Sequence, residues 1–573
     1  MAETLKFTTE RVDDIPLLLA QLERMGVQPL LDEHFPTHGN WVGLSLGWVT
    51  VLWLTHILSE ANHRLNQVEP WAEQRLHTLR SGTGQPVHPL DLGDDRLAGV
   101  LEVLSQDEPW QAFEGAFTQQ LLRVYDLQPE RVRLDSTTAS GYWKVTEDGL
   151  FQFGHSKDHR PDLAQVKIML SVLDPLGLPV ATDIVPGQRA DDPLYLPAIA
   201  RVRESVGRRG LLYVGDCKMG ALETRAALQA GGDGYLCPLA EIQLPPHVLE
   251  GYVEPVASGQ QPLTRITRLT ATGTRQHIAD GYERLAPLTA EVAGHLVAWS
   301  ERRLVVRSRQ LARAGATALR ARLAKARAAV ATLNDRGRGK PRFSDLPALQ
   351  AAVEEILTRY RVHGLLAVRY TERVRKSPLR RYGTRPATVR VTRDLGVKAV
   401  VERPAVATAI GRLGWRVYAT NAPAEQLSLA QAVLAYRSQY LVESDMGRLK
   451  GHPLSLTPMY LQRDDHATGL IRLLSVGLRV LTLLEFVVRQ RLAAARTTRA
   501  GLYAGNPTRA TARPTTERLL KRFEGLTLTI IREGRRRRYH LTPLSRVQRR
   551  ILALLNFPGD IYTRLCPDSH KPP

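Results

Sequence analysis

Cysteine is scarce in this chain of 573 residues, which contains only Cys217, Cys237 and Cys566. None of the three has the spacing of a zinc-ligand pair, so we expect neither a zinc ribbon nor a disulfide framework. Such a composition suits a reducing compartment, and the predicted location is the cytoplasm. The first residues are too polar for a signal peptide.

Acidic residues are also few relative to basic ones. The chain has 57 Asp and Glu against 78 Lys and Arg, a net charge of +21. An excess of this size favours a polyanionic partner, most often nucleic acid, because each phosphate contact releases condensed counterions. Association with ribosomes or with a membrane surface are the alternatives. The length and the folded composition favour an enzyme or an architectural DNA-binding protein.

Long apolar runs are nearly absent. One uncharged run, Trp41 to Leu58, has 18 residues and just reaches the length of a membrane span. It includes Thr50, Thr55 and His56, and no second span accompanies it. A buried helix is therefore expected here, and no membrane partner.

The length predicts several domains, and changes in residue pattern place their boundaries. The overall expectation is an α/β protein with a ribonuclease-H-like core that a large mixed α/β insertion interrupts. The predicted parts are a helical N-terminal region (1–127), the first part of the core (128–243), the insertion (244–425), the second part of the core with a helix that carries a glutamate (426–492), and a small basic C-terminal region (493–573).

The ribonuclease-H-like expectation comes from the order of elements in 128–243. Strands are predicted to end at Asp135 and to cover 166–173 and 178–185, with a turn at 174–177. A helix over 193–206, a strand over 211–214 just before Asp216, a helix over 221–230 and a strand over 235–239 follow. Three meandering strands, a helix and then strand–helix–strand is the order of that core, although other α+β folds also contain a meander followed by a helix.

A helix predicted over 436–450 has an unusual polar face. At 100° per residue, Tyr436, Gln439, Glu443 and Lys450 fall within about 60° of one another. An apolar stripe beside them would pack the helix and hold Glu443 at its edge; its residues are Val442, Met446 and Leu449. An ordinary amphipathic helix with a chance polar stripe is the alternative interpretation.

Asp135, Asp216 and Glu443 lie where such a core could bring them together. Two divalent ions about 4 Å apart can activate a nucleophile and stabilise the leaving oxygen in phosphodiester cleavage. Magnesium prefers oxygen ligands, so carboxylates on separate elements suffice. Asp191 and Asp192 instead suggest a helix start, and Asp445 points away from the polar face. The remaining competing carboxylate is Asp183.

At these residues the sequence resembles DDE transposases of bacterial insertion sequences, which carry the signature Tyr-x(2)-Arg-x(3)-Glu-x(6)-Lys. The insertion sequence 1634 branch is the most similar. The stretches that carry the resemblance, which runs from about residue 90 to the end, are R-L-D-S-T-T (133–138), G-H-S-K-D-H-R-P-D-L (154–163), V-G-D (214–216), 436–450 and 542–555.

The resemblance implies that Asp135, Asp216 and Glu443 hold two Mg²⁺ ions, or Mn²⁺, and that Tyr436 and Lys450 position DNA. Gln439 stands where the signature has arginine, which puts contacts to the strand end in doubt. The resemblance further implies cleavage of double-stranded DNA at terminal inverted repeats, joining of the 3′ ends to target DNA, and a homodimer. The N-terminal region and the basic tail would bind the element ends.

Other DNA contacts are expected from charged segments. Lys157, His159 and Arg160 suit phosphate contact, although a charged loop explains them equally well. Arg535 and Arg536 lie in a predicted hairpin turn that could also simply be exposed. Trp299 and Trp415 could stack on an extruded base or be buried. Alternatives to a transposase are a stand-alone metal-dependent nuclease and a non-catalytic DNA-binding regulator derived from a transposase.

Overall fold

The structure is a computed structural model that describes residues 5–37, 39–270, 273–337, 343, 345–381, 383–384, 386–503, 505–534 and 536–567. The chain divides into two compact units. Unit 1 comprises Met1–Cys237, Leu288–Trp299 and Ala435–Pro573, and unit 2 comprises Pro238–Pro287 and Ser300–Leu434. Helices and strands alternate in both units, so the expected mixed α/β class is confirmed.

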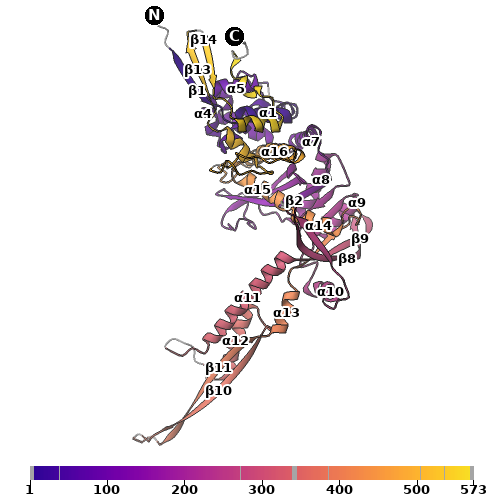
Figure 1. Ribbon diagram of the computed structural model, residues 1–573, viewed down its shortest axis with the longest axis vertical. Helices are drawn as coiled ribbons and strands as arrows, with labels where there is room; N and C mark the ends of the chain where they lie inside the picture. Colours follow the sequence, from indigo (N-terminus) through magenta and orange to yellow (C-terminus); the bar gives the residue numbers. More distant parts are fainter. Residues whose placement is uncertain are drawn as a thin grey trace. The chain divides into compact units, whose positions relative to one another are not determined.

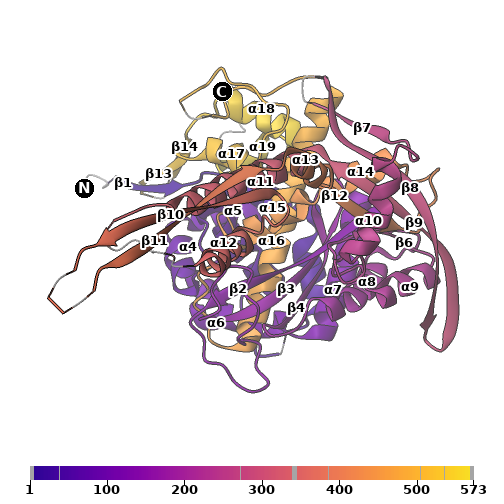
Figure 2. The same ribbon diagram turned by 90° about the horizontal axis from the view of Figure 1, so that it is seen from below.

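Unit 1 is built on five strands in the order β4-β3-β2-β5-β6 (Figure 2). The β2/β3 and β3/β4 pairs are antiparallel, whereas β2/β5 and β5/β6 are parallel. Every residue of β3 is buried, as expected for a strand with neighbours on both edges and cover on both faces. The bounds are β2 Arg131–Gly141, β3 Ala164–Leu173, β4 Leu178–Pro186, β5 Leu212–Val214 and β6 Gly234–Pro238.

Helix α16 (Asp464–Ala494) runs beside this sheet and is buried along most of its length. It contacts α6 (Asp94–Leu104) and β4. Helix α16 carries a buried arginine, Arg479, whose charge is paired. Its guanidinium donates hydrogen bonds to the Glu114 carboxylate at 2.6 Å and to the Pro179 carbonyl at 2.9 Å. Both charged side chains are fully buried, and losing either would leave the other buried and uncompensated.

The remaining helices of this part of unit 1 frame the sheet and the N-terminal region. Asp94 and Asp95 stand in the first turn of α6, where acidic side chains complement the helix dipole. The bounds are α1 Ile15–Met25, α2 Val27–His34, α3 Leu46–Glu60, α4 Val68–Glu73, α5 Leu76–Thr83, α7 Asp107–Val124, α8 Tyr195–Val206 and α9 Leu222–Ala230, with short 3-10 helices at Leu65–Gln67, Pro89–Leu92 and Asp192–Leu194.

The apolar run at 41–58 forms α3, whose residues from Leu46 to Leu58 are nearly all buried. The predicted buried helix is therefore confirmed. Thr50 and Thr55 donate their hydroxyls to the carbonyls four residues earlier, which satisfies these polar groups inside the core. Within the described residues, no helix combines the length and apolarity that crossing a membrane requires.

The expectation that residues 1–127 are wholly helical is wrong at the start of the chain. Lys6–Arg11 forms β1, which pairs antiparallel with β13 in a three-stranded sheet of order β1-β13-β14 (Figure 1). The pairing joins residues about 520 positions apart, so local periodicity could not reveal it. The tail elements are α17 Thr516–Leu520, a 3-10 turn Lys521–Phe523, β13 Thr527–Glu533, β14 Arg536–Leu541, α18 Arg546–Leu555 and α19 Asp560–Thr563.

Unit 2 contains strands in the order β12-β9-β8-β7 and a second layer of helices. Val305 and Val417, from the β9–β12 pair, form a small core with Tyr252 of α10. The bounds are α10 Pro246–Ala257, β7 Thr264–Leu269, β8 Arg275–Val292, β9 His295–Ser308, α13 Arg403–Gly411, β12 Trp415–Thr420 and α14 Leu429–Arg437. The outer ends of β8 and β9, from Leu288 to Trp299, belong to unit 1.

A second core of unit 2 joins α11 (Arg309–Thr332), α12 (Leu346–Tyr360) and the base of a two-stranded ribbon. The ribbon consists of β10 (Leu366–Leu379) and β11 (Thr388–Val401), paired over 14 residues. Beyond its base it runs on past α12 as a bare ribbon (Figure 1). The Arg/Ala-rich segment 310–330 lies within α11.

Candidate active site

Asp135 lies in the middle of β2 and not at its end, because the strand continues through Ser136, Thr137 and Thr138 to Gly141. Ser136, Thr137 and Thr138 pair with β3 and are buried. The sequence did not predict that the strand continues through them, because polar side chains give no apolar strand pattern. The Asp135 carboxylate accepts a hydrogen bond from the Ser136 amide at 2.8 Å. Its side chain is 19% exposed, so it can still reach a ligand.

Asp216 follows the neighbouring strand β5. In the parallel β2/β5 pair Arg133 stands opposite Val214, and each aspartate comes two residues later in its own strand. The sheet thus places the two carboxylates at equivalent points of adjacent strands. Asp216 accepts hydrogen bonds from the Tyr195 hydroxyl at 2.6 Å and from the Lys218 amide at 2.8 Å, which fix its orientation.

Glu443 lies in α15 (Tyr440–Lys450). The single helix predicted over 436–450 is wrong, because α14 ends at Arg437 and α15 begins at Tyr440. Tyr436 therefore does not share one continuous helix face with Glu443. The predicted apolar stripe is confirmed: Val442, Met446 and Leu449 are buried, while Glu443 is exposed.

The opposite side of α15 packs against the turn that joins β3 to β4. Asp445 is buried there, and burial raises its pKa well above the usual value. Gly177 in the turn has a φ of +78°, and a Cβ at this position would come within 2.5 Å of the Asp445 carboxylate. Glycine thus permits the close approach that holds the helix, with Glu443 on its other side.

The charges of the other two carboxylates act on Asp135. Burial raises the pKa of Asp135 to about 6; the charge of Lys157 lowers it, and the charges of Asp216 and Glu443 raise it further. Like charges that oppose ionisation of a half-buried carboxyl are typical of sites where carboxylates converge. Burial, and then the nearby Asp216, also raise the pKa of the Tyr195 hydroxyl, which keeps it a hydrogen-bond donor.

Lys157 lies against this cluster. Its ammonium group donates to the Ser136 hydroxyl at 2.7 Å and lies 3.9 Å from Asp135 and 3.6 Å from Asp191. Asp191, which the sequence suggested as a helix start, also bonds Lys167 at 2.7 Å. Burial opposes its ionisation, but the Lys167 hydrogen bond and the two lysine charges outweigh burial and lower its pKa. No local spacing signalled this aspartate–lysine network.

Gln439, which replaces the signature arginine, sits beside another arginine. The Arg133 guanidinium from β2 is fully buried and donates to the Gln439 amide oxygen at 3.5 Å. It also donates to the Ala435 carbonyl at 2.6 Å and to Asp174 at 2.9 Å. An arginine at 439 would place a second guanidinium here, so a neutral acceptor suits the position.

The predicted DNA contacts fall in different settings. Lys450 donates to Asp158 at 2.8 Å and to the Thr138 carbonyl at 3.2 Å, joining α15 to the 154–163 segment. His159 is exposed, and Arg160 is held by Asp162 at 2.7 Å. Tyr436 is half-buried at the end of α14.

Two further predictions concern the tail and the tryptophans. Arg536 is exposed at the start of β14, whereas Arg535 lies outside the described residues. Trp299 and Trp415 are buried. The Trp299 indole donates to the Tyr235 hydroxyl, and the Trp415 indole to the Gly411 carbonyl, so the buried interpretation of both tryptophans is correct.

The donor set of the three carboxylates suits hard cations such as Mg²⁺. Their oxygens do not all lie within 4.8 Å of one another; among the described residues, that spacing is met by Glu102, Asp465 and His466. Arg463 pairs with both Glu102 and Asp465 there, so that group is an ion-pair network.

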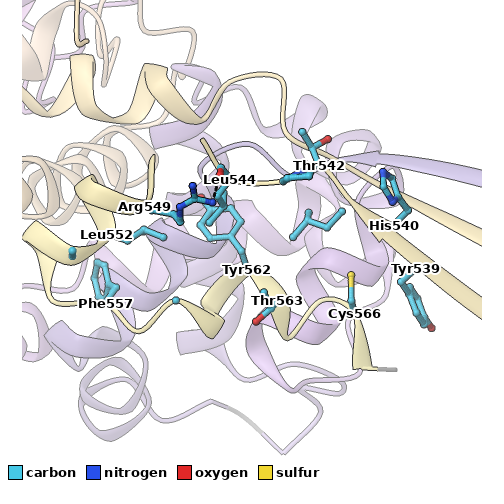
Figure 3. A pocket seen from close by; sticks show the side chains of 14 residues that line it. Tyr539, His540, Thr542, Leu544, Arg549, Leu552, Phe557, Tyr562, Thr563 and Cys566 are labelled. Carbon is cyan, nitrogen blue, oxygen red and sulfur yellow. Dashed lines mark hydrogen bonds between the residues drawn. The ribbon is translucent and has the colours of Figure 1, made fainter. Parts of the chain in front are cut away.

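A separate cavity of about 540 Å³ lies in the tail between β14, α18 and α19 (Figure 3). Leu552, Phe557 and Tyr562 give it an apolar wall, and Arg549 donates to the Leu544 carbonyl at 2.7 Å. None of the described residues that line this cavity is acidic. It therefore offers nothing comparable to the carboxylate cluster.

Comparison with known proteins gives no family assignment, since no protein-family model and no curated protein matches the chain. Among solved structures, a piggyBac transposase in a synaptic complex with hairpin DNA matches over 91% of this chain and 82% of its own. The two share 8% sequence identity, with a TM-score of 0.31.

Proposed function

We propose that the protein is a DDE transposase that cleaves DNA at the terminal inverted repeats of its element and joins the 3′ ends to target DNA. The observation that carries the proposal is that three carboxylates from separate elements converge: Asp135 and Asp216 stand at equivalent points along the adjacent parallel segments of β2 and β5, and the charges of Asp216 and Glu443 are near enough to raise the pKa of Asp135. These residues come from β2, the end of β5 and α15. Three carboxylates from separate elements, oriented by their own hydrogen bonds, suit phosphoryl transfer better than a structural role.

The arrangement of the sheet supports a ribonuclease-H-like core. Three antiparallel strands, β2 to β4, are followed by two strands parallel to β2, in the order β4-β3-β2-β5-β6. In this proposal 128–243 and 426–492 form the core and 244–425 is an insertion. The grouping of 238–287 and 300–434 into a unit of their own supports the last assignment.

Each chemical step is an in-line displacement at phosphorus. Water attacks the phosphodiester at the element end, a P–O bond breaks, and a 3′ hydroxyl is released. That hydroxyl then attacks a target phosphodiester, forming one P–O bond as another breaks. Positioning and neutralisation of charge account for most of the catalysis in such reactions.

Asp135, Asp216 and Glu443 would hold two Mg²⁺ ions, which supply charge neutralisation and activation of the attacking oxygen. Tyr195 and the Lys218 amide fix Asp216 in place. Lys157 favours the ionised form of Asp135, and Lys450 joins α15 to the 154–163 segment. Tyr436 and the exposed His159 would contact the DNA backbone.

The partners in this proposal are double-stranded DNA and a second copy of the chain, which would pair two element ends in the cytoplasm. The net charge of +21 supports a polyanionic partner. The helical N-terminal region and the basic tail, including Arg536 and Arg535, would bind the ends.

The test is a strand-transfer assay with pre-nicked element-end DNA and Mg²⁺, using the repeats that flank the gene. Asp135→Asn, Asp216→Asn and Glu443→Gln should each reduce joining by at least a thousandfold while DNA binding survives. Glu223→Gln, an exposed position on α9, is the control and should retain activity. Cleavage without joining would indicate a nuclease, and a triad variant that still joins ends would refute the site.

A further inference from the structure

The ribbon β10–β11 changes character halfway along its length. At its base, Leu366, Leu395 and Val397 belong to the core formed with α11 and α12. Asn334 clamps the base through two hydrogen bonds with the Val397 backbone, at 2.7 and 2.8 Å. From Thr371 outward on β10, every described residue of the strand is exposed, so the base is anchored and the outer half is not.

The outer half is strongly basic. Between positions 371 and 392 the sequence has seven basic residues and one acidic residue, Glu372. The basic residues are Arg373, Arg375, Lys376, Arg380, Arg381, Arg385 and Arg390. Packing within the unit does not explain this concentration, because the side chains of these strands face solvent.

Strand register sorts these charges onto the two faces. Arg375 stands opposite Thr392 and Ser377 opposite Arg390, so alternation places Arg373, Arg375 and Arg390 on one face with hydroxyl side chains between them. Asp394 lies 3.9 Å from Arg375. Within the described part of the chain, Arg373 and Arg390 have no carboxylate at ion-pair distance, so their charges are available to a partner.

The opposite face is different. It carries Val374, Val389 and Val391, which are 52%, 59% and 52% exposed. Lys376 lies among them, and Arg393 pairs with Glu372 at 3.5 Å. The arginine face also carries Asp394, which pairs with Arg375, but Arg373 and Arg390 leave it with an excess of positive charge that suits a polyanion.

We infer that the outer half of β10–β11 is a DNA-binding arm that lays its arginine face, Arg373, Arg375 and Arg390, along duplex DNA. A two-stranded ribbon fits the major groove, which is about 12 Å wide. Eight residue steps from Thr371 to Leu379 span roughly 27 Å, close to one helical turn of DNA. This inference adds a binding surface to the proposed function and does not depend on catalysis.

The test measures binding of the full-length protein to a 40-base-pair duplex of random sequence in EDTA, at a series of salt concentrations. The triple variant carries Arg373→Gln, Arg375→Gln and Arg390→Gln. Since each lost phosphate contact removes about 0.9 from the slope, the plot of log K against log salt should become less steep by roughly 2 to 3. A slope within 0.5 of wild type would overturn the inference. Unchanged thermal melting would confirm that the variant is folded.

Two control variants complete the experiment. Arg123→Gln, Arg208→Gln and Arg209→Gln remove the same charge from exposed positions elsewhere and should leave the slope unchanged; an equal loss there would refute a specific arm. Val374→Thr, Val389→Thr and Val391→Thr should preserve binding. If they abolish it, or dissociate a dimer in sedimentation, the ribbon serves a protein partner instead.

Failure of the arm and failure of the proposed function remain distinguishable. Random duplex in EDTA reports only binding, whereas the strand-transfer assay depends on Asp135, Asp216 and Glu443. An arm variant that binds like wild type refutes the arm even if end joining is intact. A less steep salt dependence in the arm variant supports DNA binding by the ribbon even if no end joining is observed.

Discussion

At the scale of single residues, Asp135 would couple protonation to metal binding in the proposed site. With its pKa near 6, a proton competes with a cation for this carboxylate over a pH range in which an ordinary aspartate, with a pKa near 3.8, stays ionised. Ligands must be deprotonated to bind. We expect Mn²⁺ affinity, measured by calorimetry, to fall about tenfold per pH unit below pH 6; constant affinity down to pH 4.5 would contradict the coupling.

Lys157 provides a matched variant for the same measurement. Its charge lowers the pKa of Asp135, so Lys157→Gln should raise that pKa and move the midpoint of Mn²⁺ binding to higher pH. Lys144→Gln removes an exposed charge from a nearby segment and should leave the midpoint in place. Equal shifts in both variants would point to net charge and not to the local contact.

The order of the predicted elements and the resemblance selected the three candidate carboxylates from the sequence, although Asp135 lies within β2 and not at a strand end. The network around them could not be predicted in this way. Three separate parts of the chain supply this network: the 154–163 segment carries Lys157, β3 carries Lys167, and Asp191 precedes the short 3-10 helix before α8. Only the fold brings them together. The sequence also could not explain Gln439, because Arg133, which donates a hydrogen bond to it, lies 306 residues away.

At the scale of elements, the position of Glu443 depends on the packing of α15. Leu449 is 0% exposed, and Leu449→Ala should lower the free energy of unfolding by about 2–5 kcal/mol. The same change should weaken Mn²⁺ binding, because a displaced helix moves Glu443. Denaturant unfolding and calorimetry measure the two effects.

Tyr440→Ala is the control for this helix, because Tyr440 is exposed on α15. It should change stability by less than about 0.5 kcal/mol. If Leu449→Ala destabilises the protein and metal binding is unaffected, the position of Glu443 does not depend on this packing.

Elements with strong local patterns were predicted to within a few residues. Strands β3 to β6 and the helices α8, α9 and α11 follow the alternation or periodicity of their own sequence. The interruption between Arg437 and Tyr440 was missed because helical periodicity continues across it.

At the scale of the whole molecule, the first strand ties distant parts of unit 1 together. The buried Glu10 carboxylate accepts hydrogen bonds from the backbone amides of His77 and Thr78 and from the Thr78 hydroxyl, at 2.7 to 2.9 Å. It thereby caps the start of α5. Glu10→Ala should lower the free energy of unfolding by about 1–3 kcal/mol.

Thermal or denaturant unfolding of the full chain measures this effect. Thr8→Ala, an exposed position on the same strand, is the control and should be close to neutral. Equal destabilisation by both variants would show that β1 contributes through its pairing with β13 and not through the cap.

The pairing of β1 with β13 also sets an order of events during synthesis. Thr9 and Thr529 are 520 residues apart, so at about 5–20 residues per second the ribosome needs on the order of 30–100 s to deliver the partner strand. Throughout that interval β1 has no β13 to pair with, and its side chains include Phe7. An unpaired strand edge invites association with other chains, so a growing chain depends on nascent-chain chaperones or on fast translation.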